Sequence, residues 1–534
     1  MLHPASYEVG GDPLTIRTLS GPVHGMLQGD VRRFLGVPYA APPVGLLRFR
    51  SPQPVVSWTA TLDATKPGNQ CPQILPIVNL ITGNEDCLFL NVFTPDPAPT
   101  RALPVMVWIH GGGFTVGSGM DDDPTTMVAK TGVIAVSINY RLGPLGFLAL
   151  PQLAGLDPHH STGDVGLEDQ QAALKWVQAN IARFGGDPNN VTIFGESAGG
   201  ISVCAQFASP LSDGLFEKGI TESGPCNLPA PSLAQAEAQG ARYASALGCA
   251  NSDQPLACLD TKPINQILTT MPPDPTFVFD RTVSWFPTAD GVVLPANTVE
   301  AFDHGDFKHL PVIVGANQDE GRLFAFLAYT AQKRTLLPGQ WADEVNTYFG
   351  PKVGPGVQEN YPLSAYPNPV AAFGEALGDG FLACPAVESA AGAARYQPVY
   401  EYEFSVQDNP FVLATPGQLS GAFHSSELPY VFGGPVESSG PISFTPAQQR
   451  LSDAMMHAWA RFAATGNPSG GGFTWPRLTR LGGSYVDFDI GGPFVATNMK
   501  GSVCPFWEHN GWSAADIGKY GSAVPNPFTS APLP

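Results

Sequence analysis

The sequence predicts an α/β fold built on a large, mostly parallel sheet that helices flank. Short apolar, β-favouring runs at 103–109, 191–194 and 310–314 lead into glycine-rich or polar segments, as buried strands do. Strand, loop and helix patterns alternate along all 534 residues, and no linker divides the chain near its midpoint. Such alternation is typical of parallel sheets. We therefore expect one domain over residues 1–534, with long loop and helical insertions.

Composition supports a sizeable core and limits the partners. Hydrophobic residues form 43% of the chain, and no apolar run reaches the roughly 18 residues that span a bilayer. The net charge is −19 with only 27 lysines and arginines, so a basic surface for nucleic acid is not expected. Neither HExxH nor the phosphate loop GxxxxGK occurs. We expect no metal, cofactor, nucleic acid or transmembrane segment.

The segment VTIFGESAGG, residues 191–200, places Ser197 between a strand and a helix. Gly195 and Gly199 supply the small side chains that a tight turn needs two positions before and after the serine. Such an elbow lifts the hydroxyl clear of the backbone, and the following helix N-terminus favours developing negative charge. For this motif alone, a glycine-rich turn with an incidental serine is the alternative interpretation.

A glycine triplet follows the strand run at 103–109, in the sequence HGGGF at 110–114. Glycines directly after a strand leave backbone N–H groups free to bind an oxyanion, and this loop is the usual partner of the serine elbow. A flexible hinge would predict no order relative to Ser197. The pair occurs here in the expected order, each after its own strand.

Many separate motifs in this order resemble the type-B carboxylesterase/cholinesterase-like family of α/β-hydrolases. The resemblance covers roughly residues 17–510 and includes, besides the two motifs above, FLGVPYAAPPVGLLRF at 34–49, EDCLFLNVF at 85–93, SINYRLGPLGFLAL at 137–150, GANQDEG at 315–321, HSSELPYVFG at 424–433 and CPFW at 504–507. It implies an α/β-hydrolase fold whose insertions form a gorge, and a serine carboxylesterase that acts through an acyl-enzyme.

The resemblance also implies the partners of Ser197. Chain order in this fold is serine, acid, histidine. Asp319 and Glu320 are adjacent in the DEG motif, so composition does not choose between them, and the resemblance assigns the acid to Glu320. Among the ten histidines, His424 alone matches the family motif, whereas His457 lies in an amphipathic helix at about 447–465.

The oxyanion donors implied by resemblance are the backbone N–H groups of Gly112, Gly113 and Ala198. Glu196, directly before the serine, either tunes the electrostatics of the site or is a solvated or hydrogen-bonded structural carboxylate. Ser223 in TESG matches a serine near the family's triad, and we expect it to have a packing role.

The eight cysteines indicate an exported protein. Two local pairs suit disulfides, Cys71 with Cys87 and Cys249 with Cys258, and the resemblance adds Cys384 with Cys504. We expect Cys204 and Cys226 to remain buried thiols. A cytosolic enzyme with eight free thiols is the alternative.

Residues 1–11 lack the pattern of a signal peptide. Because the cysteines nevertheless indicate export, we expect a secreted or periplasmic protein whose signal lies outside this numbering. The only N-x-S/T sequon, at Asn190, starts a buried strand. A nearly sequon-free exported protein favours a bacterial source.

The loop at 72–86 bears on the substrate. It has 15 residues between Cys71 and Cys87 and no tryptophan, which opposes a large lipase lid and a choline site, although its apolar residues can form a small flap. We expect the substrates to be small to medium esters. We expect the protein to be a monomer or a weak homodimer. The alternatives are a specialised hydrolase of aromatic, carbamate, toxin or polyester esters, a lipase, or a non-catalytic binding protein, which would usually have lost the serine or the histidine.

Two further expectations concern packing. Residues 277–279 and 285–286 either line the acyl side of the gorge or are ordinary core aromatics. By resemblance, Arg48 pairs with Glu85 and Arg141 with Asp169, since an unpaired arginine beside an apolar run would be costly.

Overall fold

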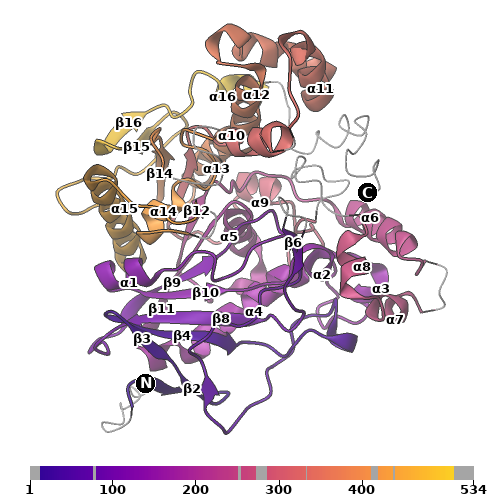
Figure 1. The fold of residues 1–534 in the computed structure, drawn as a ribbon, viewed down its shortest axis with the longest axis vertical. Coiled ribbons are helices and arrows are strands. Elements are labelled where there is room, and N and C mark those ends of the chain that lie inside the picture. The colour runs from indigo at the N-terminus through magenta and orange to yellow at the C-terminus, as the bar shows by residue number, and fades with distance from the viewer. Residues whose placement is uncertain are drawn as a thin grey trace.

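A computed structural model describes residues 12–75, 80–250, 254–271, 285–331, 333–410, 419–436 and 439–509 (Figure 1). The strands of its main sheet are β3 (Met26–Gln28), β4 (Val31–Pro38), β8 (Phe89–Pro95), β9 (Leu103–Ile109), β10 (Ile134–Ile138), β11 (Gly186–Glu196), β12 (Lys218–Glu222), β13 (Val312–Asn317), β14 (Val399–Phe404), β15 (Ser484–Asp489) and β16 (Gly492–Thr497). The outlying strands are β1 (Thr15–Arg17), β2 (Pro22–His24), β5 (Leu62–Asp63), β6 (Gln73–Leu75) and β7 (Leu80–Thr82).

The main sheet has 11 strands in the order β16-β15-β14-β13-β12-β11-β9-β10-β8-β4-β3. From β10 to β15 every neighbouring pair is parallel, whereas β8, β4 and β3 at one edge and β16 at the other are antiparallel to their neighbours. The predicted α/β class with a mostly parallel sheet is confirmed. Parallel strands need crossover segments, and helices supply most of them.

Helices lie on both faces and at the ends of the sheet. They are α1 (Thr125–Thr131), α2 (Gly143–Phe147), α3 (Pro151–Ala154), α4 (Val165–Asn180), α5 (Ala198–Ala208), α6 (Leu233–Ala246), α7 (Pro255–Asp260), α8 (Ile264–Thr269), α9 (Thr298–His304), α10 (Gly321–Ala325), α11 (Trp341–Asn360), α12 (Pro369–Gly378), α13 (Cys384–Ala393), α14 (Leu428–Phe432), α15 (Pro446–Thr465) and α16 (Cys504–His509).

Side-chain alternation along β9 divides the core between the two faces. Val105, Val107 and Ile109 belong to the core cluster that α4 and α5 cover. Met106 and Trp108 belong to the opposite cluster, which α14 and α15 cover. Both faces are therefore buried, which explains why this strand reads in the sequence as a continuous apolar run.

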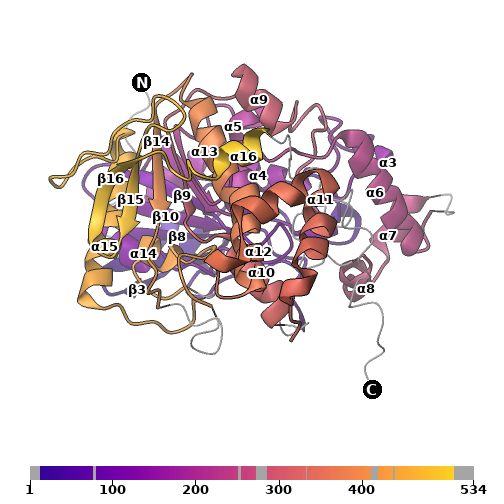
Figure 2. The same cartoon turned by 90° about the horizontal axis from the view of Figure 1, so that it is seen from above.

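Two helical insertions extend from the sheet. The first, α6–α8, lies between β12 and β13, and the second, α10–α13, lies between β13 and β14. Figure 2 shows them as two groups of helices beside the sheet. The stretch Pro369–Ala393 is long and apolar enough to cross a membrane, but 78% of its apolar window is buried inside the protein, as in a core helix. Among the described residues it is the one stretch with that property.

Both expected ion pairs are present. The Arg48 guanidinium donates to both carboxylate oxygens of Glu85 at 2.5 and 2.6 Å. Arg141 donates to both oxygens of Asp169 at 2.7 and 2.6 Å, with both side chains buried. Two parallel hydrogen bonds of this kind satisfy buried charges that would otherwise be costly.

The disulfides require a correction. The structure joins Cys71 to Cys87, Cys249 to Cys258 and Cys384 to Cys504, but it also joins Cys204 to Cys226. The expectation of two buried thiols is wrong for this structure, which leaves no free cysteine. The reason is topological. Cys204 lies on α5, which follows β11, and Cys226 follows β12; because β11 and β12 are parallel neighbours, the segments after them meet, with Cα atoms 5.1 Å apart.

Candidate active site

Ser197 stands alone between β11, which ends at Glu196, and α5, which begins at Ala198. Its φ of 54° lies in the left-handed region that non-glycine residues rarely adopt. A Cβ atom at Gly199 would lie 1.9 Å from the Ile109 carbonyl oxygen, and one at Gly195 would lie 2.6 Å from the same atom. The predicted requirement for small residues around the serine is therefore steric, and the end of β9 imposes it.

The loop after β9 brings its glycines beside this turn. Gly112 and Gly113 have φ of 95° and 60°, which glycine adopts without strain. No acceptor in the described part of the chain takes a hydrogen bond from either N–H group. The N–H of Ala198 also has no partner within its helix, because Ala198 is the first residue of α5. All three expected donors are therefore at the start of α5 or in the loop facing it.

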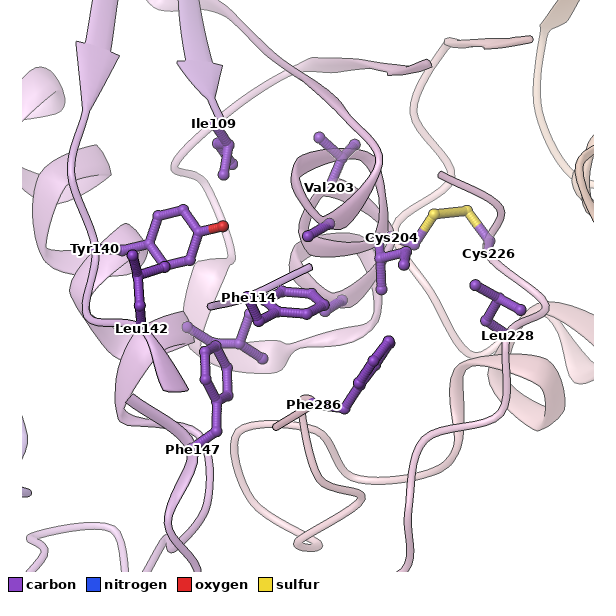
Figure 3. Packing of buried hydrophobic residues seen from close by; sticks show 14 of the residues in the cluster. Ile109, Phe114, Tyr140, Leu142, Phe147, Val203, Cys204, Cys226, Leu228 and Phe286 are labelled. Atoms are coloured by element: carbon purple, nitrogen blue, oxygen red, sulfur yellow. A yellow bond between two sulfur atoms is a disulfide. The ribbon is translucent and has the colours of Figure 1, made fainter. Parts of the chain in front are cut away.

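Packing fixes that glycine loop from behind. Phe114, fully buried with φ 59°, makes edge-to-face contacts with Phe147 and Phe286, with ring centroids 5.1 Å apart in each pair (Figure 3). The His110 ring stacks on Tyr140 at 4.4 Å, and burial lowers its pKa to about 4. A histidine of this kind stays neutral at pH 7 and serves as a packing element.

Only part of the aromatic segment expected along the gorge is described. Phe286 packs against the glycine loop, while Trp285 contacts Tyr243 at 5.2 Å in the core. Residues 277–279 lie outside the described residues. Figure 3 also places Leu228 and the Cys204–Cys226 bond near Phe286, so the start of the first insertion borders the same region.

Glu320 and His424 meet although 104 residues separate them. Glu320 follows β13, and its Oε2 lies 2.7 Å from His424 Nδ1. Glu320 Oε1 accepts a hydrogen bond from the backbone N–H of Asn317 at 2.7 Å. Both side chains are almost fully buried. The adjacent Asp319 contacts Arg322 at 2.8 Å instead, so geometry selects Glu320 between the two acids.

Glu196 occupies the other side of the imidazole. Its Oε1 lies 3.1 Å from His424 Nε2 and accepts a 2.6 Å hydrogen bond from the Ser425 hydroxyl. Glu196 is buried, which raises its pKa, so the solvated alternative for this residue is wrong. Burial lowers the pKa of His424, but the Glu196 and Glu320 carboxylates outweigh it, and the net pKa lies above the ordinary value.

The structure shows no hydrogen bond between Ser197 and His424, because Nε2 faces Glu196. Hydrogen bonds between catalytic groups are often long or misaligned before substrate binds. Ser223 lies on the loop after β12, is fully buried with φ 49°, and its hydroxyl has no partner. Its N–H donates to Gly315 at 2.9 Å, which agrees with a packing role between β12 and β13.

Ser425 and Glu427 were not singled out in the sequence. Ser425 has φ 70° directly after His424, and Glu427 is fully buried near Glu196 and Glu320, with its pKa raised by burial. The signal was their position in the HSSE motif, at one and three residues beyond the histidine. A partly buried hydroxyl and a second, fully buried acid therefore lie close to the His424 imidazole.

Most of the chain is similar to known proteins. The model of the carboxylesterase family matches residues 12–507. A para-nitrobenzyl esterase of Bacillus subtilis (strain 168) is 36% identical over 86% of this chain and 92% of its own length. A fumonisin B1 esterase of Sphingopyxis macrogoltabida is 36% identical over 88% of this chain and 86% of its own.

Solved structures are also similar. A PNB esterase has a TM-score of 0.77 at 32% identity, covering 93% of this chain and all of its own, and a thermophilic PNB esterase has a TM-score of 0.78 at the same identity and coverage. The chain thus belongs to the carboxylesterase family and is a carboxylic ester hydrolase.

Proposed function

We propose that Ser197, His424 and Glu320 form the catalytic triad of this esterase, and that it hydrolyses small to medium, dissolved carboxylic esters. The observation that carries the assignment is the buried 2.7 Å contact between Glu320 Oε2 and His424 Nδ1 beside the serine elbow. A carboxylate at Nδ1 fixes the imidazole so that Nε2 is the atom that accepts a proton.

The reaction then follows from the placement of the groups. His424 Nε2 exchanges its contact with Glu196 for the Ser197 hydroxyl and takes its proton while Oγ attacks the ester carbonyl carbon. The backbone N–H groups of Gly112, Gly113 and Ala198 donate to the resulting oxyanion.

The imidazolium next returns the proton to the leaving alkoxide, and the alcohol departs. A water molecule repeats the same steps on the acyl-enzyme and releases the acid. Throughout, Glu320 stabilises the positive charge on the imidazole without accepting the proton itself.

The loop between Cys71 and Cys87 supports a preference for dissolved substrates. Its described parts include β6 and β7, which pair with each other in antiparallel orientation. Leu80 and Ile81 are 57% and 37% exposed, so this pair of strands presents some apolar surface. A loop of this size is too short to act as a large lid over the site.

Rates measured across the solubility limit of a triglyceride test this preference. We expect the rate to follow the dissolved monomer concentration and to show no jump. A steep rise only above the limit would make the enzyme a lipase.

A specialised ester substrate is the second candidate. It is favoured by the two relatives, which are named for a para-nitrobenzyl ester and for the toxin fumonisin B1. A panel of p-nitrophenyl esters of graded acyl length, run beside aromatic, carbamate, toxin and polyester esters, separates the two candidates by their kcat/KM values.

We further infer export to the periplasm or medium, one domain and a monomer or weak homodimer. The four disulfides support an oxidising compartment. A single continuous sheet that uses strands from residue 26 to residue 497 supports one domain.

A further inference from the structure

Asn317 is the last residue of β13 and is fully buried. Its backbone N–H donates to Glu320 Oε1 at 2.7 Å. Its side-chain Nδ2 donates to the Phe423 carbonyl oxygen at 2.9 Å and to a carboxylate oxygen of Glu427. Asn317 therefore holds Glu320 through its backbone N–H. Through its side chain it holds the segment on both sides of His424.

The two segments that Asn317 joins also contact each other through the backbone. Asp319 and Ala422 exchange hydrogen bonds, the Asp319 N–H to the Ala422 carbonyl at 2.9 Å and the Ala422 N–H to Asp319 Oδ2 at 2.8 Å. The His424 N–H reaches the Glu320 carbonyl at a longer 3.3 Å. Next to His424, the Phe423 carbonyl accepts the 2.9 Å bond from Asn317 on the side of the acid, and the Ser425 hydroxyl donates to Glu196 at 2.6 Å on the other side.

The chemistry of the amide suits this place. Both partners of Nδ2 offer acceptor oxygens, so the nitrogen side of the amide must face them, and the Asn317 Oδ1 atom has no partner. A carboxylate at position 317 would face Glu427 and the Phe423 carbonyl without a donor. The Glu427 carboxylate and the Phe423 carbonyl therefore require a neutral side chain with two N–H donors, which asparagine provides.

We propose that Asn317 is a positioning residue that sets the distance between Glu320 and His424. This inference rests on the proposed triad. It predicts that loss of the side chain slows the chemical step without weakening substrate binding. A displaced base raises the activation barrier but leaves the contacts that bind the substrate in place.

Asn317→Ala removes both side-chain bonds and keeps the backbone N–H to Glu320. Asn317→Asp keeps the size of the side chain and also removes the donors. Asn180→Ala is the matched control, because Asn180 is a buried asparagine with two side-chain hydrogen bonds, to the Trp176 carbonyl at 3.0 Å and from the Leu19 N–H at 2.8 Å.

Hydrolysis of p-nitrophenyl acetate by the folded fraction from size exclusion is the measurement. We expect kcat to fall roughly 10- to 100-fold in both Asn317 variants with KM unchanged, and to stay at the wild-type value in Asn180→Ala. In Asn317→Ala the acid limb of kcat/KM should also move to lower pH, because His424 held less closely to Glu320 has its pKa raised less.

Wild-type kcat and an unmoved acid limb in Asn317→Ala would overturn the proposal, as would equal losses in the Asn180 control. Insolubility of both Asn317 variants beside a soluble control would indicate a folding role and would also overturn it. The Ser197→Ala variant tests the triad assignment separately. If Ser197→Ala is inactive but Asn317→Ala has wild-type kinetics, the result contradicts the role of Asn317 and leaves the triad assignment intact.

Discussion

The serine elbow and the acid–histidine pair are held in different ways. At the elbow, backbone packs on backbone, because the carbonyl of Ile109 at the end of β9 leaves no room for a Cβ atom at Gly199. Glu320 and His424, 104 residues apart, are held by side-chain hydrogen bonds between two segments. A local glycine pattern therefore marks the elbow, whose backbone packs against the neighbouring strand β9, whereas the acid–histidine pair depends on side-chain contacts between two distant segments.

The electrostatics of the two regions also differ. The elbow faces N–H groups and a helix N-terminus, which favour negative charge. The imidazole lies between the carboxylates of Glu196 and Glu320, which favour positive charge on it. In the proposed reaction, the transition state carries negative charge on the substrate and positive charge on the histidine, and these surroundings stabilise both charges.

The largest expected effect comes from removing the hydroxyl of Ser197, the proposed nucleophile at the elbow. Ser197→Ala should lower kcat by about 10⁶ while the fold persists, and His424→Ala should do the same, because members of a triad act as a unit. Initial rates on p-nitrophenyl acetate measure this.

Ser209→Ala, at the far end of α5, is the control and should retain activity. More than a few per cent of wild-type activity in Ser197→Ala, once contamination is excluded, would remove Ser197 from the proposed role.

The next largest effect is expected from a substitution that strains the elbow but changes none of the groups proposed to react. In Gly199→Ala the new methyl group would overlap the Ile109 carbonyl oxygen at 1.9 Å, so β9 and α5 must separate. We expect a loss of roughly 10² or more in kcat, because small misplacements at a reacting centre are costly.

Gly339→Ala is the matched control, since nothing lies within 4 Å of a Cβ atom there. Equal rates in the two variants would show that the elbow tolerates displacement.

A smaller effect concerns the charge beside the histidine. The carboxylates of Glu196 and Glu320 hold the pKa of His424 above its ordinary value, against the effect of burial. In its proposed role as the base the imidazole must be neutral, so we expect activity to fall as pH drops through this pKa. Glu196→Gln removes one carboxylate charge, lowers the pKa, and should move the acid limb of kcat/KM down by roughly one pH unit.

Glu300→Gln, which changes an exposed acid on α9, should leave the limb in place. A limb that stays fixed or moves upward in Glu196→Gln would mean that Glu196 does not contact the imidazole in solution.

The difference between the serine elbow and the acid–histidine pair also explains which features could be predicted from the sequence. The limits of β9 were predicted to the residue, and Gly195 and Gly199 marked the elbow, because both depend on local pattern. Strand β13 was expected to end at 314 but continues to Asn317, since pairing with β14 extends it, and polar residues at its end carry no strand pattern of their own.

His424 was found through a family motif, and its surroundings were not. Nothing local indicates that Asn317 contacts Phe423, or that Cys204 contacts Cys226, because each contact forms only when neighbouring parallel strands deliver their following segments to the same edge. Sequence order alone does not give that adjacency.

The smallest expected effect on activity concerns the Cys204–Cys226 bond, which joins the elbow helix to the segment after β12. It closes a loop with a sequence separation of 22, which in the chain-entropy model corresponds to about 3 kcal/mol of stability. We expect Cys204→Ala/Cys226→Ala to lose about that much free energy of unfolding in urea while kcat changes little, because close backbone contacts hold the elbow without the bond. Thiol titration of the denatured, unreduced wild type should detect no free thiol. Two thiols would restore the sequence-based expectation, and a large drop in kcat would show that the elbow depends on this bond as the acid–histidine pair depends on its side-chain contacts.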